Sequence, residues 1–174
     1  AIDGPCGSGK TTLAALLARL YDCPVFHADD FFLRPEQRTP ARFAEPGGNL
    51  DRERLLEEVL APLRQGQPVS FRRFDCHSLT LLPPVAVAPS PLAVVEGSYS
   101  LHPELAPMYD ITVCLTLSPE LQRRRILARN GEAMARRFFE RWIPLEQAYF
   151  DAMKPQMRCS FLIEADQLSD EAPL

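Results

Sequence analysis

AIDGPCGSGKTT, residues 1–12, contains the spacing that decides the fold of this chain. Gly4 is followed by four residues and then by Gly9, Lys10 and Thr11, which fits the pattern GxxxxGK[ST]. In this pattern loop N–H groups cradle phosphate oxygens, the lysine reaches the β- and γ-phosphates, and the hydroxyl ligates Mg²⁺. The stretch therefore predicts a binding site for the phosphates of a nucleotide.

The sequence after the loop supports this interpretation. Leucines recur there at helical spacing, which places Lys10 and Thr11 at a helix N-terminus, where the helix dipole favours phosphate. The rival interpretation is a glycine-rich turn between a strand and a helix. The use of lysine favours the phosphate site, because the chain is rich in arginine and one of its only two lysines, Lys10, stands where a phosphate loop needs a point charge. The residues predicted to hold ATP are Gly4, Pro5, Cys6, Gly7, Ser8, Gly9, Lys10, Thr11 and Thr12.

Composition limits the class of protein. With 174 residues, 46% of them hydrophobic and 24% charged, the chain suits one globular domain, and no long apolar run suggests a membrane span. A net charge of −4 argues against broad nucleic-acid binding. Five scattered cysteines without a CxxC pair indicate neither a disulfide framework nor a zinc site, so we expect a cytoplasmic protein. The chain starts almost on the phosphate loop, so we expect further residues upstream of Ala1.

Strands and helices alternate along the chain. Apolar runs predict strands near residues 24–27, 68–75, 92–97, 111–117 and 160–165. We expect an irregular loop or hairpin at 81–91, a helix capped by Ser118 that ends at Gly131, and a helical stretch over 132–153 broken or kinked near Pro144. This alternation predicts a P-loop NTPase α/β fold of three layers, with a mostly parallel five-stranded sheet between helices. A single domain, 1–174, then carries a substrate-loop region at about 34–91 and a lid at about 123–137.

Acidic residues fall at two of the predicted strand ends. Asp29 and Asp30, in HADDFF, follow the second strand, where a carboxylate can accept the proton of an attacking hydroxyl or hold Mg²⁺. Glu96 ends the run LAVVEG, and Mg²⁺ beside Thr11 is the partner that such a buried acid needs. The rival roles are a solvated turn for the aspartates and a salt bridge to arginine for Glu96.

Arginines surround Asn130 and Gly131. This cluster is typical of a mobile lid that brings guanidinium groups over a triphosphate, although a solvated helix face explains each arginine taken singly. Arg125 and Arg129 are the catalytic candidates, and Arg129 is also a candidate for contacting the acceptor. The cluster consists of Arg123, Arg124, Arg125, Arg129, Arg136 and Arg137.

Taken together, GPCGSGKTT, HADDFF, VVEG and LQRRRILAR resemble the uridine kinase-like branch of the P-loop kinases, which includes uridine/cytidine, nicotinamide riboside and pantothenate kinases and phosphoribulokinases. The resemblance makes Asp29 the base and Glu96 a magnesium-associated residue. It also implies, from GGNLD, that Asp51 binds ribose hydroxyls; the rival role for Asp51 is a helix N-cap. The base-recognition segment departs from the family, because RFDCHSLTL has Phe74 and a shorter spacing to His77, which is a weaker substrate candidate.

The sequence thus predicts a Mg²⁺-dependent kinase that transfers the γ-phosphoryl group of ATP to a small molecule, with the 5′-hydroxyl of uridine or cytidine as the leading acceptor. Nicotinamide riboside, another vitamin precursor, a sugar phosphate or a nucleoside monophosphate stay open as acceptors. An NTP-binding switch that acts through a partner is the rival of another class. We expect no nucleic-acid or membrane partner, and homo-oligomerisation stays open.

Overall fold

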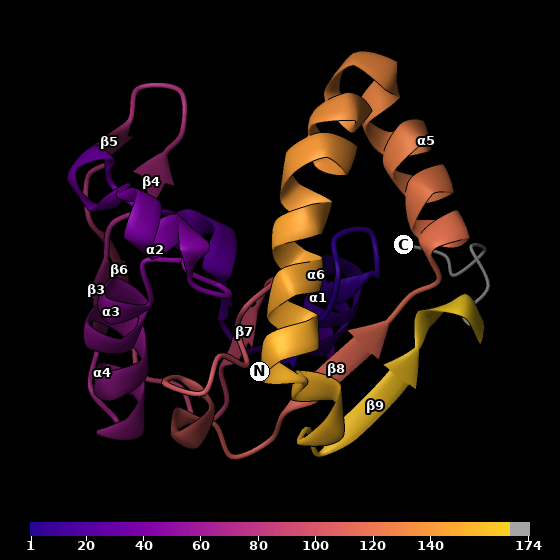
Figure 1. The fold of residues 1–174 in the computed structure, drawn as a ribbon. Coiled ribbons are helices and arrows are strands. Elements are labelled where there is room, and N and C mark those ends of the chain that lie inside the picture. Colours follow the sequence, from indigo (N-terminus) through magenta and orange to yellow (C-terminus); the bar gives the residue numbers. More distant parts are fainter. Residues whose placement is uncertain (168–174) are drawn as a thin grey trace.

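The computed structural model describes residues 1–167 and contains a five-stranded parallel sheet between helices (Figure 1). The strand order is β2-β7-β1-β8-β9, and every neighbouring pair is parallel. The strands are β1 (Ile2–Asp3), β2 (Val25–His27), β7 (Val94–Glu96), β8 (Val113–Thr116) and β9 (Phe161–Glu164). The predicted fold class and five-stranded sheet are confirmed.

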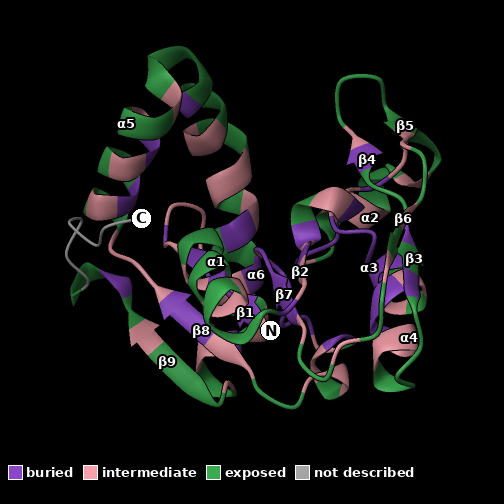
Figure 2. Cartoon of the chain, turned by 180° about the vertical axis from the view of Figure 1, so that it is seen from behind, coloured by how far each residue is buried: buried purple, intermediate pink, exposed green. Residues whose placement is uncertain are grey.

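Two long helices cover opposite faces of this sheet. Helix α1 (Lys10–Tyr21) and helix α6 (Ile143–Met153) lie on either side of it, as the two opposed views show (Figures 1 and 2). Buried side chains of Ile2, Ala14, Val94 and Leu115 fill the space beneath α1. Because the sheet is parallel, the carboxyl ends of β1, β2 and β7 meet at one edge, where a ligand can bind.

The region from 34 to 91 forms a second part beside the sheet (Figure 1). It contains short helices, with α3 running through a wide π turn at Leu56–Leu60 into α4, and one long antiparallel hairpin made of two successive ladders, β3–β6 and β4–β5. Phe31 and Phe71 stack there in a core that also reaches Phe26 of β2. The elements are α2 (Pro40–Ala44), α3 (Arg52–Leu55), α4 (Ala61–Arg64), β3 (Val69–Phe71), β4 (Phe74–Asp75), β5 (Thr80–Leu81) and β6 (Val85–Val87).

The strand expected over 68–75 forms, but it is interrupted after Phe71 and so divides into β3 and β4. Both parts pair with the same returning segment, β3 with β6 and β4 with β5, so the two ladders follow one another in one long hairpin. At the interruption the Arg72 guanidinium donates to the carbonyls of Leu81 and Leu82, and the Arg72 backbone N–H donates to Glu58. The segment at 81–91, expected to be a loop or an irregular hairpin, supplies β6 of this hairpin. The hairpin lies outside the central sheet, so apolar runs alone did not distinguish local pairing from a place in the parallel sheet.

The helices that follow Ser118 also differ in one detail from the expectation. Helix α5 (Pro119–Arg137) begins at the Ser118 cap and leaves helical geometry at Gly131, as predicted (φ 68°, ψ 168°). No break occurs at Pro144: the backbone stays helical from the π turn at Phe138–Trp142 into α6, and this wider turn directly precedes Pro144, whose ring and missing N–H do not fit a regular helical turn. α5 and α6 therefore form a V that rises from the sheet (Figure 1).

Candidate functional site

The phosphate loop has the backbone that its sequence requires. Gly4 lies against β8, and a Cβ there would come within 2.7 Å of the Leu115 carbonyl oxygen. Gly9 has φ 93° directly before α1, a conformation that glycine adopts without steric cost. The first N–H groups of α1 have no partner within the helix, so they are available to phosphate oxygens.

Lys10 is held within the same loop. Its Nζ donates to the carbonyl oxygens of Gly4 at 2.8 Å and Pro5 at 3.0 Å, and the side chain is largely buried. An ammonium group has three donors, so one remains for a phosphate oxygen. The loop therefore holds the Lys10 ammonium group beside the place where the nucleotide phosphates are expected.

Thr11 and Glu96 meet, as the sequence predicted. The Thr11 hydroxyl donates to Glu96 Oε1 at 3.1 Å, and the Glu96 side chain is 6% exposed. His27, from the end of β2, approaches the same oxygen at 2.6 Å through Nδ1, and this hydrogen bond to Glu96 raises the pKa of His27. Within residues 1–167 no group of three or more His, Cys, Asp or Glu side chains is placed to hold a metal ion. A hydroxyl and one carboxylate fit Mg²⁺, which takes few protein ligands and keeps several waters.

Asp29 lies in the helical turn Ala28–Phe31 that follows β2. Its residue surface is exposed, yet desolvation by the surrounding protein raises the pKa of its carboxyl, against the opposing charge of Lys10. The charges of Glu96 and Glu146 also raise the pKa of Asp29. The turn that carries Asp29 follows β2, so it lies at the same edge of the parallel sheet as the end of β1, from which the phosphate loop starts.

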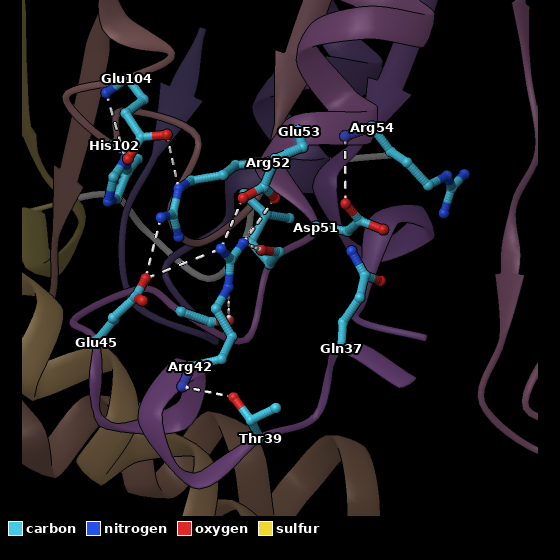
Figure 3. A network of polar contacts seen from close by, with 12 residues as sticks. Gln37, Thr39, Arg42, Glu45, Asp51, Arg52, Glu53, Arg54, His102 and Glu104 are labelled. Atoms are coloured by element: carbon cyan, nitrogen blue, oxygen red, sulfur yellow. Dashed lines mark hydrogen bonds and ion pairs between the residues drawn. The ribbon is translucent and has the colours of Figure 1, made fainter. Parts of the chain in front are cut away.

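Asp51 is fully buried and caps α3: Oδ1 accepts from the backbone N–H of Arg54 at 3.2 Å. Oδ2 accepts no hydrogen bond and lies 3.6 Å from Arg34 Nε. The preceding loop is held by Arg42, which donates to the carbonyls of Gly48 and Leu50 and pairs with a glutamate on α3 (Figure 3). The structure thus gives Asp51 the helix-cap role, and a ribose could reach Oδ2 only after the Arg34 segment moves.

Removing the Asp51 side chain tests this role. We expect Asp51→Ala to lower the free energy of unfolding by about 1–2 kcal/mol, as for other lost caps, and Asp51→Ser to restore most of it, because serine also caps helices. Urea unfolding of the two variants checks this. A KM for the acceptor that rises in a fully stable Asp51→Ser would instead demonstrate the ribose contact that the family resemblance implies.

The predicted lid arginines and His77 lie at the edges of the site. An Arg125 guanidinium N–H donates to the Gly7 carbonyl at 3.3 Å, so α5 contacts the phosphate loop at its base. Arg129 hydrogen-bonds to Asn130 and stacks on Phe138, and Arg123 lies over Phe139, so rings of the adjoining π turn hold both guanidinium groups. His77 is exposed at the turn between β4 and β5.

Asp3 is a site residue that sequence reasoning missed. It is fully buried and accepts four hydrogen bonds, from the N–H groups of Gly4, Tyr99 and Leu101 and from the Tyr149 hydroxyl. Burial raises its pKa to about 6. Because the donors come from the phosphate loop, the segment after β7 and α6, Asp3 joins three parts of the site. An acid inside an apolar strand beside the loop is the only local signal for it.

Asp3→Ala should lower the free energy of unfolding by about 3 kcal/mol, because it leaves four buried donors without an acceptor. Tyr149→Phe is the matched control: it removes one of the same bonds and should cost about 1 kcal/mol. Denaturant unfolding of both variants makes the comparison. Equal losses in the two would show that Asp3 does not organise this region.

Glu146 and Gln122 also escaped the sequence reasoning. Glu146 accepts the backbone N–H of Cys6, which the sequence placed among the phosphate-binding groups, and Gln122 donates to the Cys6 carbonyl. The only sequence signal for Glu146 is an acid on the apolar helix face formed by Ile143, Tyr149 and Phe150, and Gln122, in an arginine-rich helix, has no such signal.

In the described part of the chain, no helix is long and apolar enough to cross a membrane.

Comparison with known proteins gives the site its context. No protein-family model matches the chain. A dephospho-CoA kinase from Jannaschia sp. is 30% identical, over 96% of this chain and 88% of that protein. Uridine-cytidine kinase D from Dictyostelium discoideum is 27% identical over 66% of this chain and 23% of its own length. The structure of a possible uridine kinase from Bacillus stearothermophilus has a TM-score of 0.70 at 24% identity, over 93% of this chain and 85% of that chain, which supports the fold.

Proposed function

Since this chain belongs to the P-loop kinases of the uridine kinase and dephospho-CoA kinase type and is an ATP-dependent phosphotransferase, we propose that its acceptor group is a ribose hydroxyl. The observation that carries the proposal is the position of Asp29, a carboxylate of raised pKa whose electrostatic neighbours include Lys10 and Glu96. Simple storage of a nucleotide needs no carboxylate there. The kinase relatives also weigh against the nucleotide-dependent switch.

Each residue then has a part in the transfer. Asp29 orients the acceptor hydroxyl and accepts its proton. Lys10 and the arginines Arg125 and Arg129 stabilise the charge on the transferred phosphoryl group. Thr11 and Glu96 would hold Mg²⁺, which neutralises charge on the β- and γ-phosphates when bound. Asp51 and His77 stay predictions as acceptor contacts.

Two acceptors follow from different observations. The 5′-hydroxyl of uridine or cytidine is favoured by the likeness of HADDFF and GGNLD to uridine kinases. Dephospho-CoA is favoured by a relative that matches 96% of this chain and is named for that acceptor. Both molecules contain a ribonucleoside, so a pocket for ribose suits either. They differ in charge, because only dephospho-CoA carries a pyrophosphate.

Measuring ADP release with Mg·ATP across a panel of acceptors tests the proposal. The panel contains uridine, cytidine, adenosine, dephospho-CoA, nicotinamide riboside, pantothenate and sugar phosphates. We expect strong stimulation by one ribonucleoside-containing acceptor and none when Lys10→Ala replaces the wild type. Stimulation by pantothenate or a simple sugar phosphate alone would refute the ribose assignment while leaving the kinase intact.

A further inference from the structure

Cys6 of the phosphate loop is held on both sides of its backbone by helices α5 and α6. Its N–H donates to Glu146 Oε2 at 2.9 Å, and its carbonyl accepts from Gln122 Nε2 at 3.0 Å. Gln122 belongs to the first turns of α5, and Glu146 to the first turn of α6. Both side chains are buried. One residue of the loop is therefore fixed by two helices that follow it by more than a hundred positions.

Glu146 extends this contact to the segment that carries Glu96. Its Oε1 accepts from the Ser98 hydroxyl at 2.7 Å, and that hydroxyl also lies 3.1 Å from the Gly4 carbonyl oxygen. Within residues 1–167 Glu146 forms no ion pair, so a buried carboxylate is kept in place by neutral N–H and O–H donors alone. Burying a carboxylate without a counter-ion lowers the free energy of unfolding. We therefore take its position beside the phosphate loop as a sign of a functional role.

Glu146 and Gln122, here called the clamp on Cys6, have positions that indicate this role. Gln122 lies near the start of α5 and Glu146 in the first turn of α6, so both are remote in sequence from Gly131, where the arginine-bearing helix leaves helical geometry. Arg125, one turn after Gln122, contacts the next loop residue through the Gly7 carbonyl. With both polar backbone groups of Cys6 taken by α5 and α6, and the N–H of Ser8 donated to the Pro5 carbonyl, the N–H groups of Gly7 and of residues 9–12 are the ones left for phosphate.

We propose that Glu146 and Gln122 are positioning residues that set the phosphate loop in its nucleotide-binding conformation and couple it to the lid. The proposal rests on the proposed function, because it assumes that this loop binds ATP. Neither residue touches the reacting atoms. Their effect is on where the loop backbone lies, so it should appear in nucleotide affinity.

Substitutions at Glu146 separate positioning from bulk stability. Glu146→Ala removes both hydrogen bonds and should raise the dissociation constant for Mg·ATP about tenfold. Glu146→Gln should restore wild-type affinity, because its oxygen can accept from Cys6 N–H while its amide donates to Ser98. Gln147→Ala is the control: Gln147 lies on the same helix, and among residues 1–167 its amide hydrogen-bonds only to the exposed Asp151. Calorimetric titration with a non-hydrolysable ATP analogue gives the affinities.

Gln122→Ala provides a second test should Glu146→Ala fail to fold. It should weaken nucleotide binding in the same direction, and the double variant should lose less than the product of the two single losses, because both residues act on Cys6. Affinity in Glu146→Ala equal to that of Gln147→Ala, or no rescue by Glu146→Gln, would overturn the clamp. The titration needs no acceptor, so a wild type that binds ATP but phosphorylates nothing would defeat the proposed function and leave the clamp testable.

Discussion

Asp29→Asn lowers kcat for the acceptor reaction by about a hundredfold or more and leaves ATP affinity nearly unchanged, if Asp29 takes the acceptor proton. Asparagine preserves the size of the side chain but cannot accept a proton. The structure isolates the effect, since Asp29 lies outside the phosphate loop on the turn after β2. Steady-state kinetics with both substrates varied measures kcat and the two KM values separately.

Asp30→Asn is the matched control for this variant. Asp30 is the next residue of the same turn, and burial raises the pKa of its carboxyl as well. It should lose little activity, because it is not the assigned base. Near-normal turnover in Asp29→Asn, or equal losses in the two variants, would remove the assignment of Asp29.

The pH profile gives Asp29 a second readout. A base must be ionised, so activity falls as pH drops through its pKa. Because desolvation raises that pKa, the acid limb of the kcat profile should lie above the ordinary titration range of aspartate. In Asp30→Asn the acid limb of the kcat profile should stay at the same pH as in the wild type.

Lys10→Met should lower kcat/KM by about a hundredfold to a thousandfold, the cost of removing one preorganised donor at a developing charge. Methionine matches the length of the lysine stem but leaves the Gly4 and Pro5 carbonyls without the ammonium that they accept from in the wild type. Lys10 also lowers the pKa of Asp29, so its loss should move the acid limb to still higher pH. Kinetics across pH measures both effects.

The only other lysine of the chain supplies the control. Lys154 is exposed at the C-terminal end of α6. Lys154→Met removes the same charge and should leave kcat/KM unchanged. Similar losses in the two variants would mean that net charge, and not the ammonium in the loop, accounts for the effect.

Local sequence was sufficient for the parts of this site whose neighbours are set by one motif or by strand ends. The GxxxxGK[ST] spacing fixes Lys10 and Thr11 relative to the loop, and the end of a parallel strand brings Glu96 to the same edge, so their meeting was predictable. The five-stranded sheet followed from alternating strands and helices in the same way.

The residues that sequence reasoning missed depend on distant partners. Asp3 binds donors up to 146 positions away, and Glu146 reaches Cys6 across 140 positions, so no local pattern reveals either contact. The interruption of the strand over 68–75 likewise lies at Arg72, whose guanidinium donates to carbonyls on the returning side of the hairpin. Asp51 shows the remaining difficulty: a cap and a ribose ligand have the same sequence pattern, and burial distinguishes them only in three dimensions.

The amount of phosphorylated acceptor formed per ADP, determined by mass spectrometry for the wild type and Asp29→Asn, tests the central claim most directly. We predict one phosphorylated ribonucleoside-containing product for each ADP with the wild type, and almost none with Asp29→Asn at the same occupancy of ATP. ADP that appears with free phosphate and no phosphorylated acceptor would contradict the account.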